Sequence, residues 1–475
     1  LAEYKQALRR IKFEELFYFQ MNLQALKADN KSEANGLMIA YDEQKVADKI
    51  ASLPFDLTGG QKRSLSDILS DMRSGGHMNR LLQGDVGSGK TVVASLAMYA
   101  AYTAGYQSAL MVPTEILAEQ HFESLMQLFP DLSIAILTSG MKAANKKAAL
   151  AAIADGSVDM IVGTHALIQD TVSYHRLGFV ITDEQHRFGV NQRRIFREKG
   201  ENPDVLMMTA TPIPRTLAIT AFGEMDVSII DELPAGRKPI ITRWVKHEQL
   251  DIVLDWVKKE LPKGAQAYVI SPLIEESESL DLKNAIALHE DLSEYFADCA
   301  NVALMHGRMK NEEKEAIMQD FKAQKSQVLV STTVIEVGVN VPNATIMIIM
   351  DADRFGLSQL HQLRGRVGRG DKQSYAILVA NPKTETGKKR MKIMTETTDG
   401  FALAEADLKM RGSGEIFGTR QSGIPEFQVA DIVEDYNILE EARRVASQIV
   451  SNPNWRQEPQ WQIITQNLKD KGNFD

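Results

Sequence analysis

The sequence GDVGSGKT at residues 84–91 limits the possible folds of this chain more than any other feature. It fits the phosphate-loop pattern, in which glycines let backbone N–H groups converge on phosphate oxygens at the start of a helix. The apolar pair Leu81 and Leu82 precedes the pattern and a helix-compatible run follows it. This is the strand–loop–helix context that the pattern requires, so the segment predicts a nucleotide-binding α/β domain.

The chemistry of a nucleoside triphosphate site can be assigned along this loop and one later segment. Lys90 would reach the β- and γ-phosphates, and the Thr91 hydroxyl would ligate Mg²⁺. Asp183 and Glu184 follow the apolar run LGFVIT, at the carboxyl end of a predicted strand, which is the edge where open parallel sheets bind ligands. We expect Asp183 to hold Mg²⁺ and Glu184 to orient and deprotonate the attacking water. The residues expected to contact the nucleotide here are Gly84, Asp85, Val86, Gly87, Ser88, Gly89, Lys90 and Thr91.

Short apolar runs alternate with helical stretches on both sides of one interruption. The runs SALMV, DMIVG, GFVIT and VLMMT come first, and AQAYVIS, VALMH, QVLVST, TIMIIM and YAILVA come later. Such alternation predicts βαβ units and parallel sheets, here two α/β domains in tandem. The interval at residues 223–245 contains Pro234, Gly236 and Pro239 and is interpreted as a linker. Residues 1–30 carry Leu16, Phe19, Leu23 and Leu26 at helical spacing, which predicts a packing helix.

Composition excludes several classes of protein. The 475 residues exceed one typical domain, and 44% hydrophobic with 25% charged residues is typical of globular proteins. A single cysteine, Cys299, excludes a disulfide framework and favours a reducing compartment, so we expect a cytoplasmic protein. No apolar run approaches the about 18 residues of a membrane span, and we expect no membrane partner. The net charge of −9 argues against a uniformly basic nucleic-acid binder, but local patches decide phosphate contacts.

The segment QLHQLRGRVGRG at residues 359–370 points to a specific kind of ATPase. Arginines alternate with glycines there, and guanidinium groups can stabilise charge on a transferring phosphoryl group. If the second domain contributes to the nucleotide site, Arg366 and Arg369 become arginine fingers supplied in cis. Hydrolysis would then be coupled to the opening and closing of a cleft.

With these motifs in order, residues 55–425 resemble the superfamily-2 helicases and translocases, which have two RecA-like domains. PFDLTGGQKRSL resembles the adenine-recognition segment, which implies that Gln61 reads the base and Phe55 packs nearby. MVPTEILAEQH, TSG and VGTHALI resemble strand-tracking motifs, and TATPIPRT resembles the segment that couples hydrolysis to movement. MHGRM and STTVIEVGVNVPNAT resemble their second-domain counterparts, with Thr332, Thr333 and Glu336 near the cleft or the nucleic-acid backbone. The residues to which the resemblance gives coupling or DNA-contact roles are His186, Thr209, Thr211, Gln362, Arg411 and Arg420.

The subfamily follows from longer segments. DEQHRFGV, TATPIPRTL and DLKMRGSGEIFGTRQSG resemble both the RecG family and the transcription–repair coupling translocase Mfd. In those families the last segment forms a helical hairpin and loop that convert domain closure into movement along duplex DNA. DELPAGRKPI and TRQSGIPEFQVADIVEDYNILEEA resemble RecG specifically. An Mfd-like translocase, an RNA helicase of the DEAD type and a non-motor P-loop ATPase remain alternatives. A basic stretch that would precede the tracking segment comprises Lys388, Lys389, Arg390 and Lys392.

The resemblance implies a monomeric DNA translocase that acts on duplexes, forks and junctions, with a single-stranded-DNA-binding protein as a further partner. The chain opens on Leu1 rather than methionine, and we expect the N-terminal wedge domain of RecG-like proteins to be absent from it. Whether fork recognition resides in these residues is left open, as are polarity, step size and the preferred junction. The expected parts are N-terminal connecting helices (1–50), an ATP-binding RecA-like domain (51–232), a second RecA-like domain (233–382) and a translocation hairpin with a helical C-terminal region (383–475).

Overall fold

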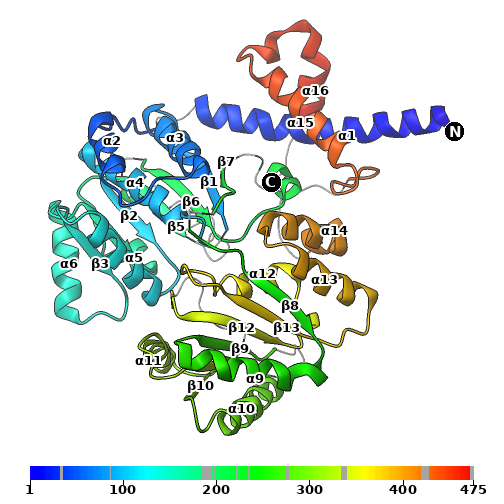
Figure 1. The fold of residues 1–475 in the computed structure, drawn as a ribbon. Helices are drawn as coiled ribbons and strands as arrows, with labels where there is room; N and C mark the ends of the chain where they lie inside the picture. Colours follow the sequence, from blue (N-terminus) through cyan, green and yellow to red (C-terminus); the bar gives the residue numbers. More distant parts are fainter. Residues whose placement is uncertain are drawn as a thin grey trace. The chain divides into compact units, whose positions relative to one another are not determined.

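A computed structural model gives the structure of the chain (Figure 1). It describes residues 1–475 except for eight short segments and four single positions. These are 33–35, 86, 184–194, 197, 201, 221–222, 224, 234–235, 273–277, 333–339, 419–426 and 471–475. The side chains of 30–32, 215, 412–418 and 469–470 are also outside the description.

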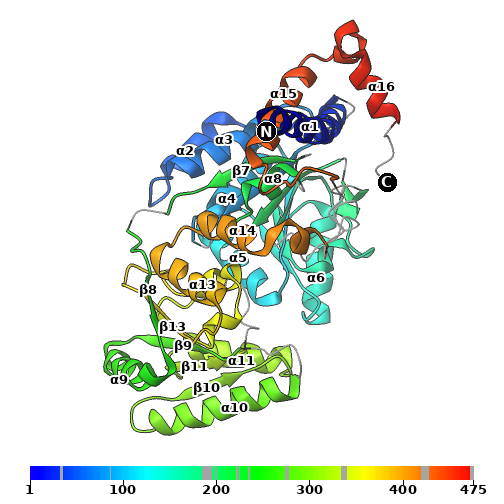
Figure 2. The same ribbon diagram turned by 90° about the vertical axis from the view of Figure 1, so that its right-hand side faces the viewer.

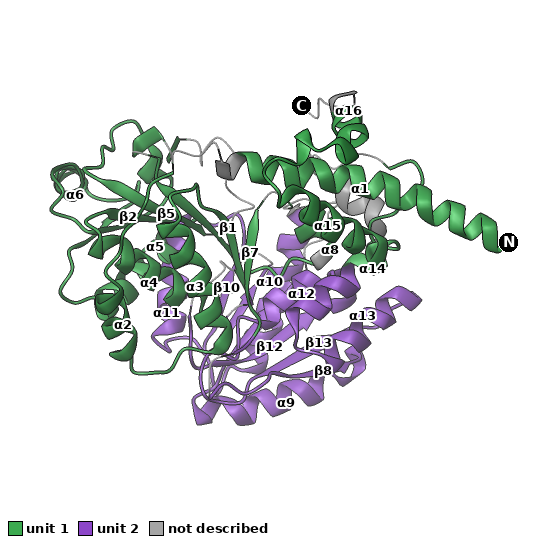
Figure 3. Ribbon diagram, turned by 90° about the horizontal axis from the view of Figure 1, so that it is seen from above, with its two compact units in different colours: residues 1–84, 89–231, 408–475 green, residues 85–88, 232–407 purple. Residues whose placement is uncertain are grey.

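The chain divides into two compact units, coloured separately in Figure 3. Unit 1 comprises Leu1–Gly84, Gly89–Asp231 and Leu408–Asp475, and unit 2 comprises Asp85–Ser88 and Glu232–Asp407. Each unit contains one sheet whose strands are all parallel. The predicted fold class, two tandem RecA-like α/β domains with a helical C-terminal segment, is confirmed.

Unit 1 is built on a seven-stranded sheet with the order β3-β4-β2-β5-β6-β1-β7. Its strands are β1 (Asn79–Gly84), β2 (Gln107–Met111), β3 (Ile134–Leu137), β4 (Met160–Gly163), β5 (Leu177–Asp183), β6 (Asp204–Thr209) and β7 (Asp226–Ile230). Because strand side chains alternate between faces, Phe179 and Ile181 enter one apolar cluster and Val180 enters another. Both faces are therefore covered, as parallel sheets require.

Helices cover the two faces of this sheet. They are α2 (Glu43–Ala51), α3 (Gly59–Arg73), α4 (Lys90–Thr103), α5 (Glu115–Leu128), α6 (Ala143–Asp155) and the short α8 (Arg215–Thr220), with a 3₁₀ turn η1 (His165–Ile168). Their boundaries follow from local chemistry. The Thr114 hydroxyl accepts the Leu117 N–H at the start of α5, and Gly156 ends α6 in the left-handed conformation (φ +83°) that glycine adopts without strain.

Unit 2 has a six-stranded sheet with the order β10-β11-β9-β12-β13-β8. Its strands are β8 (Ile241–Val245), β9 (Gln266–Ile270), β10 (Val302–Met305), β11 (Val328–Ser331), β12 (Ala344–Met350) and β13 (Tyr375–Val379). Its helices are α9 (Leu250–Glu260), α10 (Glu278–Tyr295), α11 (Asn311–Lys322), α12 (Leu357–Arg364) and α13 (Glu385–Glu396), with 3₁₀ turns η3 (His247–Gln249), η4 (Leu261–Lys263) and η5 (Ala352–Arg354). The nine predicted apolar runs are all strands, five of them in this sheet.

The linker interpretation of residues 223–245 is wrong in part. The interval contains β7, the edge strand of the first sheet, and β8, the edge strand of the second. Pro239 and Gly236 lie between the two strands, where neither has to fill a ladder position. β3 was also not predicted, and it is another edge strand, of four residues. β7 (DVSII) and β8 (ITRWV) place polar residues among their apolar ones, which weakens the apolar pattern, whereas the edge strand β10 was predicted from VALMH.

The first helix of the chain packs against a C-terminal helix within unit 1. Figures 1 and 2 both show α1 (Ala2–Ser32) beside α15 (Tyr436–Val450). The shared core includes Leu16, Met21, Leu439 and Trp455, and each such buried side chain contributes about 1.5–3 kcal/mol. The remaining C-terminal elements are α14 (Gly400–Gly418), η6 (Trp455–Gln457), η7 (Pro459–Trp461) and α16 (Gln462–Asp470).

The predicted N-terminal helix is thus confirmed, although one of its expected core positions is not buried. Leu16 and Phe19 are buried, whereas the Leu26 side chain is 51% exposed. No helix within the described part of the chain combines the length and apolar character that crossing a bilayer would demand.

Candidate functional site

The phosphate-loop segment connects β1 to α4. β1 is an inner strand, paired with β6 on one side and β7 on the other. Gly87 (φ +80°) and Gly89 (φ +86°) adopt the left-handed conformation, which the loop can reach because neither residue carries a Cβ. Gly89 is the N-cap of α4 and offers no side chain to the helix terminus, so the first-turn N–H groups of α4 are left for an anion.

The two residues assigned to phosphate and metal binding open this helix. Lys90 and Thr91 are the first residues of α4, and both are partly buried. Ser88 is buried, and Val86 lies outside the described residues. The loop conformation, the uncapped helix start and the chemistry of Lys90 and Thr91 fit a nucleoside triphosphate with Mg²⁺.

The sheet brings Asp183 to the same edge as this loop. Asp183 is the last residue of β5, and β6 lies between β5 and β1 in the sheet. Because all three strands are parallel, their carboxyl ends meet at one edge. The edge therefore collects the end of β1, Thr209 at the end of β6, and Asp183. Glu184 and His186 fall outside the described residues.

A histidine that the sequence analysis did not single out contacts this carboxylate. His121 Nε2 lies 3.6 Å from Asp183 Oδ2, and the His121 side chain is 8% exposed. His121 belongs to α5, which follows β2, and β2 pairs with β5. His121 is the last residue of the segment MVPTEILAEQH, and Asp183 lies 62 positions later in the sequence. The contact between them follows from the strand order, which the sequence alone does not give.

Gln61 connects the start of α3 to the phosphate loop. Its Oε1 accepts the Thr58 N–H at 2.8 Å and completes a capping box, while its Nε2 donates to the Gly89 carbonyl at 3.1 Å. The side chain is 2% exposed. Gln61 thus holds the phosphate loop by a hydrogen bond to its backbone, and the adenine contact predicted for Gln61 remains a prediction. Phe55 is 45% exposed, and its predicted adenine contact remains a prediction.

The segment after β6, for which a coupling role was predicted, is tied to β1 by a second buried glutamine. The Thr209 hydroxyl accepts the Thr211 N–H at 3.1 Å, which shapes the turn that follows the strand. Gln83 Oε1 then accepts the Ile213 N–H at 3.0 Å, and Gln83 is 1% exposed. Gln83 lies in β1, directly before the phosphate loop. Its side chain therefore joins β1 to the segment to which coupling is assigned. Sequence reasoning missed it because it reads as an ordinary strand residue.

The Gly/Arg segment of unit 2 contains arginines of different character. Arg364 is 1% exposed and donates to Thr242 Oγ1 (3.1 Å), the Met394 carbonyl (2.8 Å) and His361 Nδ1 (3.1 Å). Burial lowers its pKa to about 10. Arg364 therefore holds α12 to β8 and α13 inside unit 2.

The two predicted finger arginines follow Arg364 in the loop. Arg366 is 6% exposed. Arg369 Nε donates to the Gly365 carbonyl at 3.4 Å, and burial, offset in part by Tyr268, lowers the Arg369 pKa to about 10. The Arg369 guanidinium is charged at neutral pH. Gln362 is partly buried on α12, and Thr332 is buried, whereas Thr333 and Glu336 lie outside the described residues.

The basic stretch of α13 exposes three of its four cations. Lys388, Lys389 and Lys392 are exposed, and Lys388 Nζ lies 3.5 Å from Glu385. Arg390 instead donates to the Phe355 carbonyl at 2.6 Å, so it serves packing within unit 2 rather than the surface. On α14, Arg411 is exposed, and Arg420 falls outside the described residues.

Three family models cover most of the chain. A DEAD/DEAH box helicase model matches residues 58–219, and a helicase conserved C-terminal domain model matches 248–371. A third model, described as ATP-dependent DNA helicase RecG, domain 3, C-terminal, matches 397–474. The third match covers the segment that the RNA-helicase and non-motor alternatives leave unexplained, and its model is described as RecG rather than Mfd.

Individual proteins agree with these matches. The ATP-dependent DNA helicase RecG of Streptococcus pneumoniae is 72% identical over 100% of this chain, which spans 71% of that protein. The RecG of Bacillus subtilis is 57% identical over 99% of this chain, which spans 69% of it. A solved structure of RecG bound to a three-way DNA junction is 42% identical over 92% of this chain, with a TM-score of 0.75, and this chain spans 57% of it. A yeast Dbp5 structure with RNA, 17% identical with a TM-score of 0.54, shares only the fold. The chain therefore belongs to the RecG family of ATP-dependent DNA helicases.

Proposed function

We propose that this protein uses ATP hydrolysis to translocate on duplex DNA and to remodel stalled replication forks and recombination junctions during repair. One observation carries the proposal. The same chain contains the sheet edge where the phosphate loop and Asp183 lie together, and a region at residues 397–474 that matches the RecG model. The relative whose structure was solved on a three-way DNA junction supports junctions as the substrate class.

The roles at the nucleotide site follow from charge and position. Lys90 neutralises the β- and γ-phosphates, and Thr91 with Asp183 holds Mg²⁺, which offsets phosphate charge when bound. Glu184 positions and deprotonates the attacking water. Arg366 and Arg369 supply positive charge to the transferring phosphoryl group. Gln61 and Phe55 hold the adenine.

Movement on DNA requires groups beyond hydrolysis. We assign coupling to His186, Thr209, Thr211 and Gln362, and contacts with DNA phosphates to Arg411 and Arg420. Affinity for DNA then comes mainly from phosphate contacts and falls as salt rises. We further propose a cytoplasmic monomer that works beside a single-stranded-DNA-binding protein.

The test is ATP hydrolysis by this chain without nucleic acid and with single-stranded DNA, linear duplex, forked duplex and RNA, each at two salt concentrations. Glu184→Gln serves as the blank, because it removes the base while preserving size. We expect strong stimulation by duplex or forked DNA that weakens at the higher salt, and little by RNA. Hydrolysis that is indifferent to every nucleic acid would exclude a DNA motor in these residues.

A further inference from the structure

Glu15 of α1 binds the backbone of the segment that connects α14 to α15. Its carboxylate accepts hydrogen bonds from three consecutive N–H groups, those of Gln428 (3.1 Å), Val429 (3.1 and 3.2 Å) and Ala430 (2.9 Å). A charged acceptor shared by several backbone donors forms stronger hydrogen bonds than a neutral one. A single side chain thus sets the path of residues 428–430.

Two further residues of α1 hold the same segment from the same side. Lys12 Nζ lies 3.0 Å from Asp435 Oδ1, and the Phe19 ring meets the Phe427 ring edge-to-face at 5.4 Å. Positions 12, 15 and 19 are three and four residues apart, so they share one face of the helix. Asp435 in turn accepts the Asp431 N–H at 2.8 Å, which closes the turn before α15.

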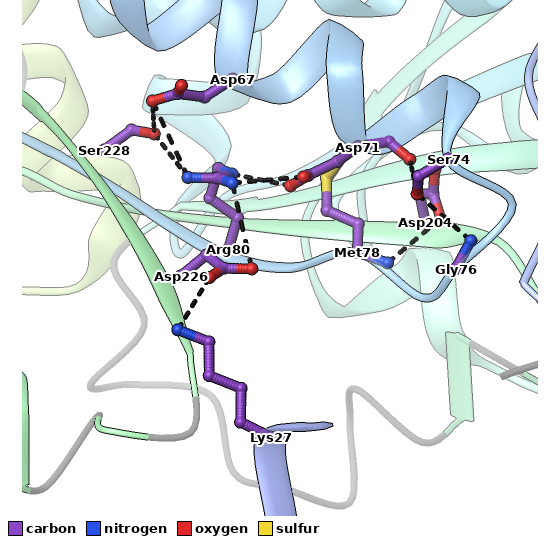
Figure 4. A network of polar contacts seen from close by, with 10 residues as sticks. All are labelled: Lys27, Asp67, Asp71, Ser74, Gly76, Met78, Arg80, Asp204, Asp226 and Ser228. Carbon is purple, nitrogen blue, oxygen red and sulfur yellow. Dashed lines mark hydrogen bonds and ion pairs between the residues drawn. The ribbon is translucent and has the colours of Figure 1, made fainter. Parts of the chain in front are cut away.

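The helix that carries Glu15, α1, also contacts two elements of the first sheet's domain, α8 and β7. Gln20 Nε2 donates to the Ile219 carbonyl of α8 at 3.2 Å, and α8 begins within the predicted coupling segment TATPIPRT. Lys27 Nζ lies 2.9 Å from Asp226 of β7. Figure 4 shows that Asp226 also faces Arg80 of β1, which is paired with Asp71 of α3.

α1 therefore connects two places that the proposed function uses. One is α8, which begins within the predicted coupling segment, and the other is residues 427–435, after the region to which DNA tracking is assigned. We propose that Glu15 is a positioning residue for translocation, because it fixes the segment that follows the tracking region to the helix that also contacts α8. The inference rests on the proposed function and adds a residue that touches neither nucleotide nor DNA.

The test compares Glu15→Ala and Glu15→Gln with Glu14→Ala in the intact protein. Glu14 is the neighbouring acid on α1 and is exposed, so its variant makes the same change of charge without the backbone contacts. DNA-stimulated ATP hydrolysis and displacement of a triplex-forming strand are measured on one duplex, together with hydrogen exchange of the 428–430 amides. Lys12→Met is a second variant on the same face, in case Glu15→Ala does not fold.

We expect Glu15→Ala to hydrolyse ATP within about twofold of the parent while the strand displaced per ATP falls at least fivefold. The 428–430 amides should exchange at least tenfold faster, and Glu15→Gln should fall between parent and Glu15→Ala. Lys12→Met should lower displacement per ATP in the same direction.

Two results would overturn the assignment. Unchanged displacement per ATP despite faster exchange would show that the contact does not serve movement. Equal loss of hydrolysis and displacement with a lower unfolding temperature would show a purely structural role. A Glu14→Ala protein and a parent that both hydrolyse ATP without displacing any strand would instead refute the proposed function.

Discussion

His121 Nε2 lies 3.6 Å from Asp183 Oδ2, and the two side chains are only 8% and 13% exposed. The distance exceeds that of a normal hydrogen bond, so the imidazole packs beside the carboxylate without forming a direct hydrogen bond to it. It limits the rotamers of the carboxylate that we assign to Mg²⁺. Groups behind a metal ligand typically control its orientation, and their loss costs about 10- to 100-fold in metal affinity or activity.

Replacing His121 by Ala should therefore raise the Mg²⁺ concentration that half-saturates ATP hydrolysis by about tenfold. The rate at saturating Mg²⁺ should recover most of the parent value, because Asp183 itself is retained. His175→Ala is the control, since His175 is an exposed histidine of the same unit. A Mg²⁺ titration of hydrolysis decides the question, and superimposable curves for all three proteins would refute the role.

Gln61 offers a variant that separates its two contacts. Gln61→Glu keeps an oxygen for the Thr58 N–H but places a carboxylate oxygen against the Gly89 carbonyl, where Nε2 now donates. The capping box survives, while the phosphate loop loses a hydrogen bond and gains repulsion. We expect the KM for ATP to rise about tenfold, which corresponds to about 1.4 kcal/mol, with little change in the unfolding temperature.

The matched comparison for that variant is Gln61→Ala, which removes both contacts. It should raise the KM and also lower the unfolding temperature, because α3 loses part of its N-terminal cap. Steady-state kinetics and thermal unfolding are measured on both proteins. A lower unfolding temperature for Gln61→Glu than for Gln61→Ala would mean that the side chain mainly stabilises the fold.

The central strands and the phosphate loop could be predicted because their signals are local. A strand that is buried on both faces is a continuous apolar run, and the loop is a contiguous pattern that ends at Thr91. The contacts of Gln83, His121 and Glu15 could not be predicted, because each depends on strand order or on helix packing across large separations in sequence. A buried glutamine such as Gln83 carries no pattern until the fold supplies its partner, the Ile213 N–H.

The same limit explains the Gly/Arg segment. The sequence assigned finger roles to Arg366 and Arg369 and left Arg364 without a role. The structure supplies that role, because Arg364 is engaged by Thr242, His361 and the Met394 carbonyl inside unit 2. The sequence can therefore locate a functional segment without showing what each residue in it does.

Lysine substitutions should separate these arginines by their effects. Arg364→Lys cannot satisfy three partners with one ammonium group, and we expect it to lose about 3 kcal/mol of unfolding free energy. Arg366→Lys should keep ATP affinity while hydrolysis falls about 100-fold or more, because an ammonium group keeps the charge but cannot reproduce the planar, two-pronged contact of a guanidinium with the transferring phosphoryl group. Urea unfolding, ATP binding and hydrolysis are measured on both. If Arg364→Lys and Arg366→Lys lost similar stability and kept similar hydrolysis, the two arginines would not have different roles.

Asp204 gives unit 1 a pH-dependent stability. It opens β6 and is 0% exposed, with its Oδ1 accepting the Met78 N–H at 3.4 Å (Figure 4). Burial raises its pKa from 3.8 to about 8, the Met78 N–H opposes this, and the like charge of Asp71 adds to it. The folded protein therefore keeps this carboxyl protonated at neutral pH, whereas the unfolded chain releases the proton above about pH 4.

Because the folded state binds the extra proton, the stabilisation is complete below pH 4 and is lost as pH rises toward 8, at up to about 1.4 kcal/mol per pH unit. Asp204→Asn keeps an oxygen for Met78 and cannot ionise. It should abolish this slope and exceed the parent in stability at pH 8. Urea midpoints of unit 1 between pH 5.5 and 8.5 measure the effect, with the exposed Asp131→Asn as control. Parallel pH profiles for the parent and Asp204→Asn would show that the carboxyl is ionised in the fold, and that water or a cation reaches it.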